Sequence, residues 1–192
     1  MTLLIAGLLV FLGAHSLRIV ADPWRARQIA RLGPGPWKGL YSLVSLVGFA
    51  LIVWGYGIAR GAPVVVWTPP TWTRHLAALL TLPAFVLLAA AKVPGNQIKA
   101  AVGHPMIVGV KVWAFAHLLS NGNLADVVLF GAFLAWAIVD FIAARRRDRV
   151  AGTRAAPGSA ARSLVAAVAG LVAWGVFAFV LHGPLIGVRP FG

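Results

Sequence analysis

Cysteine is absent from this chain of 192 residues, and acidic residues are scarce, since Asp and Glu together number four. The absence of cysteine excludes disulfide bonds, thiolate metal sites and a cysteine nucleophile. The sequence also lacks a phosphate-binding glycine loop, a zinc-protease motif, paired carboxylates and the nucleophile elbow of hydrolases. Hydrolysis and phosphoryl transfer of the usual kinds are therefore not expected.

What the chain has in abundance is apolar sequence, because 60% of its residues are hydrophobic and only 11% are charged. A chain of this length accommodates about six membrane spans of roughly 20 residues each. We find six apolar stretches, at residues 2–21, 40–59, 74–91, 105–120, 124–144 and 163–181, of which 105–120 is short for a crossing. The sequence therefore predicts an all-α, polytopic membrane helix bundle of about six transmembrane helices, in one domain spanning residues 1–192.

The basic residues lie mostly in the loops between these stretches, so the net charge of +13 indicates a lipid bilayer as partner and no nucleic acid. Cytoplasmic loops of membrane proteins are enriched in Lys and Arg. This rule places both termini outside the cytoplasm, with few basic residues on that side: Arg60, Arg74 and Arg189. The cytoplasmic side then holds Arg25, Arg27, Arg31, Lys38, Lys92, Lys99, Arg145, Arg146, Arg147, Arg149, Arg154 and Arg162.

A few ionisable residues fall inside or at the edges of the apolar stretches, where a charge is costly and therefore indicates function. His15 and Arg18 are one helical turn apart and share a face. His104 and Lys111 share another face, from which His117 is turned by about 140° at 100° per residue. Asp140 lies at a depth where Lys111 or Arg18 is expected to pair with it, because an unpaired buried charge is unfavourable. These residues also offer a polar path through the membrane.

Histidine inside a membrane serves as an interhelical hydrogen-bonding group or as a ligand of a metal or haem iron. Haem additionally needs an apolar slot between helices and cations near its propionates. His15 and His117 are candidate axial ligands, and Arg18 and Lys111 are candidate propionate partners. The residues alone leave haem, a bare metal and structural hydrogen bonding open.

Several motifs resemble the NnrU family over about residues 1 to 150. They are residues 15–18 (HSLR), 38–45 (KGLYSLVS), 93–99 (VPGNQIK), 103–106 (GHPM) and 111–122 (KVWAFAHLLSNG). The resemblance implies a bacterial inner-membrane protein with periplasmic termini, linked to nitrite and nitric oxide respiration in denitrifying bacteria. The family is related to plant 15-cis-zeta-carotene isomerase, a membrane enzyme that binds haem b through histidine.

The resemblance thus implies haem b as cofactor, with His15 and His117 as iron ligands. His15 with His104 is the alternative pair, because the predicted depths of His15 and His117 differ by about 10 Å at 1.5 Å per helical residue. The implied function is redox or isomerase-like chemistry on an apolar small molecule that enters from the lipid, and whether the protein is an enzyme stays open.

Two alternative functions remain beside haem chemistry. One is a small proton-coupled transporter that uses Lys111, Asp140, Arg18 and His15 as its polar path. The other is an assembly subunit of a respiratory complex in which the histidines are structural. A homo-oligomer or a respiratory-complex partner is compatible with each of these functions.

Overall fold

The computed structural model describes residues 1–153 and 156–191, so the predicted loop residue Arg154 lies outside the described part. Its helices form two compact units. Unit 1 comprises Met1–Trp67 and Gly122–Trp136, and unit 2 comprises Thr68–Asn121 and Ala137–Gly192. One helix, α7 (Leu124–Val150), contributes its first half to unit 1 and its second half to unit 2.

The remaining elements of unit 1 are α1 (Thr2–Val20), α2 (Asp22–Leu32) and α3 (Pro34–Arg60). Unit 2 contains α4 (Thr71–Lys92), α5 (Gln97–Val102), α6 (Pro105–Ser120), α8 (Ala160–Val176), the π-helix η1 (Phe177–Leu181) and α9 (His182–Ile186). Only isolated β-bridges, and no strands, accompany these helices in the described residues. The prediction of an all-α fold is confirmed.

Within the described residues, five helices are long and apolar enough to cross a membrane: α1, α3, α4, α7 and the continuous segment Ala160–Ile186. The sixth predicted span is α6, which is apolar but only 16 residues long. A perpendicular crossing needs about 20 residues. The fold is therefore that of a multi-pass membrane protein, with α6 as the short member that the sequence predicts.

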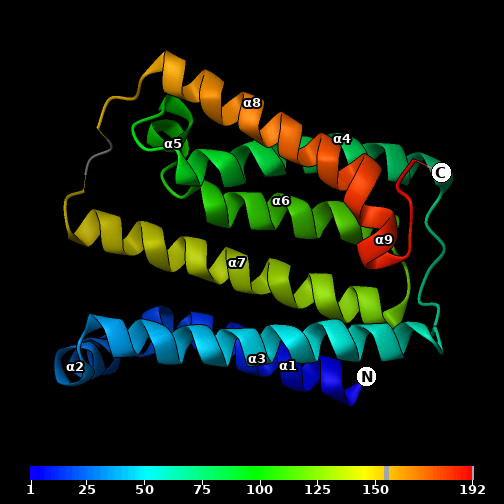
Figure 1. Ribbon diagram of the computed structural model, residues 1–192, viewed down its shortest axis with the longest axis horizontal. Helices are drawn as coiled ribbons and strands as arrows, with labels where there is room; N and C mark the ends of the chain where they lie inside the picture. Colours follow the sequence, from blue (N-terminus) through cyan, green and yellow to red (C-terminus); the bar gives the residue numbers. More distant parts are fainter. Residues whose placement is uncertain (154–155, 192) are drawn as a thin grey trace. The chain divides into compact units, whose positions relative to one another are not determined.

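In unit 1, α1 and α3 pack side by side with glycines at their contact (Figure 1). A Cβ on Gly7 would lie 2.5 Å from the backbone nitrogen of Ile52, and a Cβ on Gly48 would lie 2.7 Å from that of Phe11. The two helices are antiparallel, because higher positions on α1 meet lower positions on α3. Small residues allow such close approach in lipid, where van der Waals packing replaces the hydrophobic effect between helices.

In unit 2, α4 contacts both α6 and α8 (Figure 1). A Cβ on Gly109 of α6 would lie 3.0 Å from the carbonyl oxygen of Ala84, and one on Gly170 of α8 would lie 2.5 Å from the Cα of Val86. The indole Nε1 of Trp174 donates to the Thr81 hydroxyl at 3.0 Å. Close helix contacts at glycines therefore stabilise each unit internally.

Two short helices, α2 and α5, lie where the sequence predicts loops. Asp22 and Pro23 begin α2, and Gly33 ends it with a φ of +83°, so that Pro34 starts α3. The expected Arg-rich loop after residue 144 is also partly helical, because α7 continues to Val150. Alanine and arginine are good helix formers, so this helix extends beyond its apolar part.

Asn96 organises the turn between α4 and α5 and is only 1% exposed. Its side-chain amide donates to the carbonyl of Ala90 at 2.8 Å and also to that of Val93, while its Oδ1 accepts from the backbone N–H of Lys99 at 2.7 Å. The segment before α8 lies on this turn, since Ser159 donates its N–H to the Gly95 carbonyl at 2.8 Å. This buried amide fixes one end of unit 2.

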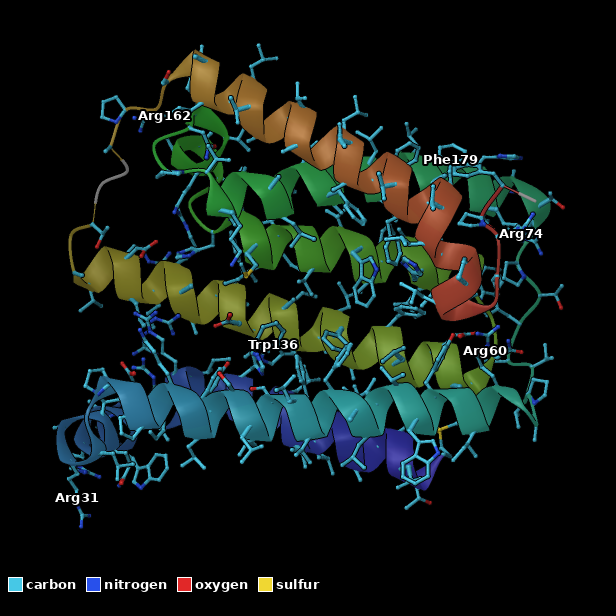
Figure 2. All side chains as sticks on the ribbon, viewed as in Figure 1. Arg31, Arg60, Arg74, Trp136, Arg162 and Phe179 are labelled. Atoms are coloured by element: carbon cyan, nitrogen blue, oxygen red, sulfur yellow. The ribbon has the colours of Figure 1, made fainter. Side chains whose placement is uncertain are left out.

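Basic residues occupy opposite ends within each unit, as the predicted topology requires. Figure 2 shows Arg31 and Arg60 at opposite ends of unit 1. Within unit 2, Arg162 lies at one end and Arg74 at the other. The sequence assigns Arg31 and Arg162 to the basic side and Arg60 and Arg74 to the other side, so each unit separates them as expected.

Candidate functional site

His15 lies on α1 in unit 1, and its ring is oriented by a local hydrogen bond. Its Nδ1 is 2.7 Å from the carbonyl oxygen of Phe11, one turn earlier on the same helix. A carbonyl accepts but does not donate, so Nδ1 carries the proton and Nε2 carries the lone pair of a neutral imidazole. Many histidines that bind a metal through one ring nitrogen donate a hydrogen bond from the other to a backbone carbonyl.

Aromatic rings from three helices of unit 1 surround the imidazole of His15. Phe11 of α1 stacks on it with centroids 4.2 Å apart, Tyr41 of α3 lies at 5.3 Å, and Trp136 of α7 meets it edge-on at 6.1 Å. Figure 2 labels Trp136 on α7. Aromatic rings from α1, α3 and α7 therefore pack around the His15 imidazole.

Trp136, one of the rings around His15, carries a hydrogen-bond donor that lacks an acceptor. Its Nε1 is buried and has no hydrogen-bond partner in the described part of the chain, and the hydroxyl of Ser45, one turn after Tyr41 on α3, shares that condition. Leaving such groups unpaired costs free energy. An acceptor carried by a bound molecule next to His15 would remove part of that cost, so the residues present fit a bound cofactor.

Arg18, the predicted propionate partner, follows His15 by three residues and lies in the last turn of α1. This places it on the same face and nearer the basic end of the helix. His15 and Arg18 thus belong together in unit 1.

His117 lies in unit 2, near the end of α6, and has the same local arrangement as His15. Its Nδ1 is 2.8 Å from the carbonyl oxygen of Trp113, and the two rings are 5.2 Å apart. Nδ1 is therefore the donor, and Nε2 carries the lone pair. Asn121 donates its side-chain amide to the His117 carbonyl at 2.9 Å and so closes the helix end. Since His15 belongs to unit 1, the pairing of the two histidines stays a prediction.

His104 differs from both, because a carboxylate engages its Nε2. This nitrogen is 2.8 Å from Oδ2 of Asp148 on α7, and the ring of Phe141 meets the imidazole edge-on at 6.3 Å. His104 immediately precedes α6, where Pro105 begins the helix. In unit 2 this histidine forms a polar pair instead of presenting Nε2 as a ligand.

Lys111, one of the two partners that the sequence offered for Asp140, forms no ion pair with it in the described residues. Asp140 lies 3.7 Å from Nη2 of Arg147, seven residues further along α7, and the Nζ of Lys111 lies 3.8 Å from the ring centroid of Phe141. The aromatic face stabilises the ammonium as a cation–π contact. The expected pairing of Asp140 with Arg18, a residue of unit 1, stays a prediction.

Asp126 of α7 makes a contact with a distant helix that the sequence did not predict. It lies in the first turn of α7, and its Oδ2 accepts from the backbone N–H and the side-chain amide of Asn123, at 3.2 and 3.1 Å. In addition, the hydroxyl of Tyr56 on α3 donates to Oδ1 at 2.5 Å. Asp126 is 3% exposed. Sequence gave no signal for Tyr56, because the two residues are 70 positions apart.

No group of three or more His, Asp or Glu side chains gathers into a metal site within the described residues. A bare metal ion usually takes most of its ligands from such a group. A haem iron takes four nitrogens from the porphyrin and only one or two axial ligands from the protein. Single, locally oriented histidines such as His15 and His117 are the type of protein ligand that a haem iron takes.

The helices and their intramembrane polar residues define the class of this protein as an all-helical, multi-pass membrane protein. Within that class the chain belongs to the NnrU family, because the family model described as NnrU protein matches residues 3–190. Neither the comparison with curated proteins nor that with solved structures finds a match. The family resemblance of the motifs is thereby confirmed.

Proposed function

We propose that this protein binds haem b in the membrane, with His15 as an axial ligand of the iron. The observation that carries the proposal is the hydrogen bond from His15 Nδ1 to the Phe11 carbonyl, which leaves the lone pair on Nε2. The aromatic rings of Phe11, Tyr41 and Trp136 around His15 support it, since a porphyrin needs apolar surroundings between helices.

The second ligand in this proposal is His117, and the assignment rests on the family resemblance. The bond from His117 Nδ1 to Trp113 supports it, because it selects the same tautomer as in His15. His104 is the weaker alternative, since its Nε2 is 2.8 Å from the Asp148 carboxylate. Arg18 and Lys111 are the proposed propionate partners, and neither is required to touch the iron.

When bound, haem supplies redox chemistry and an iron coordination site that suits isomerase-like reactions or nitric oxide. The carbonyls of Phe11 and Trp113 orient the two histidines, and aromatic rings surround His15 with apolar surface. The substrate we propose is an apolar small molecule that enters from the lipid, and the family link suggests a setting in nitrite and nitric oxide respiration. The proposed location is the bacterial inner membrane, with the basic ends of the helices in the cytoplasm.

The test is a visible spectrum of the detergent-purified protein, oxidised and reduced, after expression with a supply of haem. We expect a haem Soret band in the wild type and its loss in both His15→Ala and His117→Ala. The matched control is His104→Ala, which removes an imidazole from the same chain and should leave the band. A wild type without haem absorbance contradicts the proposal, and loss of the band in His104→Ala with retention in His117→Ala shifts the second ligand to His104.

A small proton-coupled transporter is the second candidate function. It is favoured by Lys111, which lies in an apolar helix with no carboxylate within ion-pair distance among the described residues. An intramembrane cation in this condition is typical of ion and substrate paths. Substrate flux in proteoliposomes that disappears in Lys111→Ala, from a preparation without haem absorbance, would favour transport over haem chemistry.

A further inference from the structure

Two hollows lie at the basic end of unit 2, one where α4 ends and α6 begins and the other at the end of α7. The first has a volume of about 210 Å³ and is lined by Ala91, Lys99, Gly103, His104, Pro105, Met106 and Ile107. The second has a volume of about 240 Å³ and is lined by Arg145, Asp148, Arg149, Gly152 and Thr153. A phosphate group fits within either volume, and neither hollow is lined by His15 or His117, the two histidines proposed as iron ligands.

The two hollows are neighbours on either side of one polar pair. His104 lines the first and Asp148 lines the second, and their Nε2 and Oδ2 atoms are 2.8 Å apart. Arg145, which lines the second, also reaches the first, because its Nη1 lies 3.1 Å from where a Cβ on Gly103 would stand. The absence of a side chain at Gly103 therefore lets the guanidinium approach the first hollow.

Positive charge dominates these linings. Lys99, Arg145 and Arg149 are exposed, and none of them lies within ion-pair distance of a carboxylate in the part of the chain that the structure describes. The single carboxylate present, that of Asp148, is engaged by His104. Three uncompensated cations around two adjoining hollows attract an anion of more than one charge.

We propose that these hollows, the Lys99–Arg145 site, bind a phosphate-bearing anion. Lys99 and Arg145 donate to the phosphate oxygens, and the guanidinium provides the bidentate geometry that phosphate favours. The site lies at the level where membrane helices end, so an anionic phospholipid headgroup reaches it from the bilayer and a soluble phosphate compound reaches it from water. Basic pockets at helix ends bind anionic headgroups in other membrane proteins.

The test measures binding of four probes to the full chain in detergent, with native mass spectrometry for lipids and unfolding temperature for soluble ligands. The lipid probes are phosphatidylglycerol and, as the neutral control, phosphatidylcholine. The soluble probes are glycerol 3-phosphate and inorganic phosphate. Lys99→Gln and Arg145→Gln should each weaken binding about fivefold, the effect of one basic residue near an anionic surface.

Lys92→Gln is the matched control, because Lys92 is an exposed cation at the same end that lines neither hollow. Preferential binding of phosphatidylglycerol alone supports a lipid ligand, and binding of glycerol 3-phosphate or phosphate supports a soluble one. Equal binding of phosphatidylcholine and phosphatidylglycerol, with no soluble probe bound, overturns the proposal. So does a result in which Lys92→Gln weakens binding as much as Lys99→Gln and Arg145→Gln, provided that all variants keep the helix content of the wild type.

Discussion

The two units each contain a histidine oriented by a backbone carbonyl but differ in the partners of the carboxylates that α7 contributes to them. In unit 1 the partners are uncharged, since the Tyr56 hydroxyl and Asn123 bind Asp126. In unit 2, charged side chains are prominent, as in the pairs His104–Asp148 and Asp140–Arg147. A backbone carbonyl orients His15 in unit 1 and His117 in unit 2, the two proposed iron ligands, whereas the basic end of unit 2 is suited to bind an anion.

Both units nevertheless rely on glycine contacts between helices, and breaking one should have the largest effect. Gly55→Val would place a side chain against the backbone of Leu3 and Leu4 on α1. We expect a loss of roughly 3 kcal/mol or more, because the two helices would have to separate. The measurement is thermal unfolding in mild detergent. Gly57→Val on the same helix is the control, since nothing lies within 4 Å of its Cβ position, and an equal loss there would refute the packing role of Gly55.

Loss of the hydrogen bonds that Asp126 accepts in unit 1 should give the next largest loss of stability. Asp126→Ala removes the acceptor of three hydrogen bonds and leaves the Tyr56 hydroxyl and the Asn123 amide unsatisfied. The expected cost is about 2–3 kcal/mol. Asp140→Ala, which breaks the longer ion pair of unit 2, should cost less than about 1 kcal/mol. If chemical unfolding in detergent shows equal losses for the two variants, the contrast between the units is wrong.

Replacing Lys111 of unit 2 should have a smaller effect on stability, and one of opposite sign. Its ammonium lies on the Phe141 ring in an apolar helix, so Lys111→Met should raise the unfolding temperature of the haem-free protein, by roughly 1 kcal/mol of stability. The same variant should retain less haem, because it loses a propionate partner. Lys111→Arg keeps the charge and is the control in both assays. A Lys111→Met protein that is less stable than the wild type and holds haem equally well would contradict this role.

The membrane fold could be predicted well from the sequence, because lipid forces long apolar stretches into helices. The boundaries could not: α2 is polar, α5 is six residues long, and the arginines at the end of α7 look like a loop on hydropathy alone. Apolar sequence therefore identifies spans but not helical segments outside the lipid.

The candidate site shows a similar division. Their position in apolar stretches made His15 and His117 candidates, and the family resemblance implied them as ligands; their local hydrogen bonds run to residues four positions earlier on the same helix. The partners of Asp126, Asp140 and His104 depend on tertiary packing or on side-chain reach. His104 and Asp148, for example, are 44 positions apart, and no local pattern connects them. Hydrogen bonds within one helix can therefore be predicted from the sequence, whereas contacts between distant helices cannot.

Imidazole rescue of His15→Gly is the measurement that decides whether His15 ligates a haem iron. The substitution removes the side chain that bears the proposed lone pair and leaves room beside Phe11, Tyr41 and Trp136. Haem absorbance should disappear in the purified variant and return when imidazole is added, while His104→Gly should keep the wild-type spectrum throughout. A His15→Gly protein that retains the wild-type Soret band without imidazole would contradict ligation of the iron by His15.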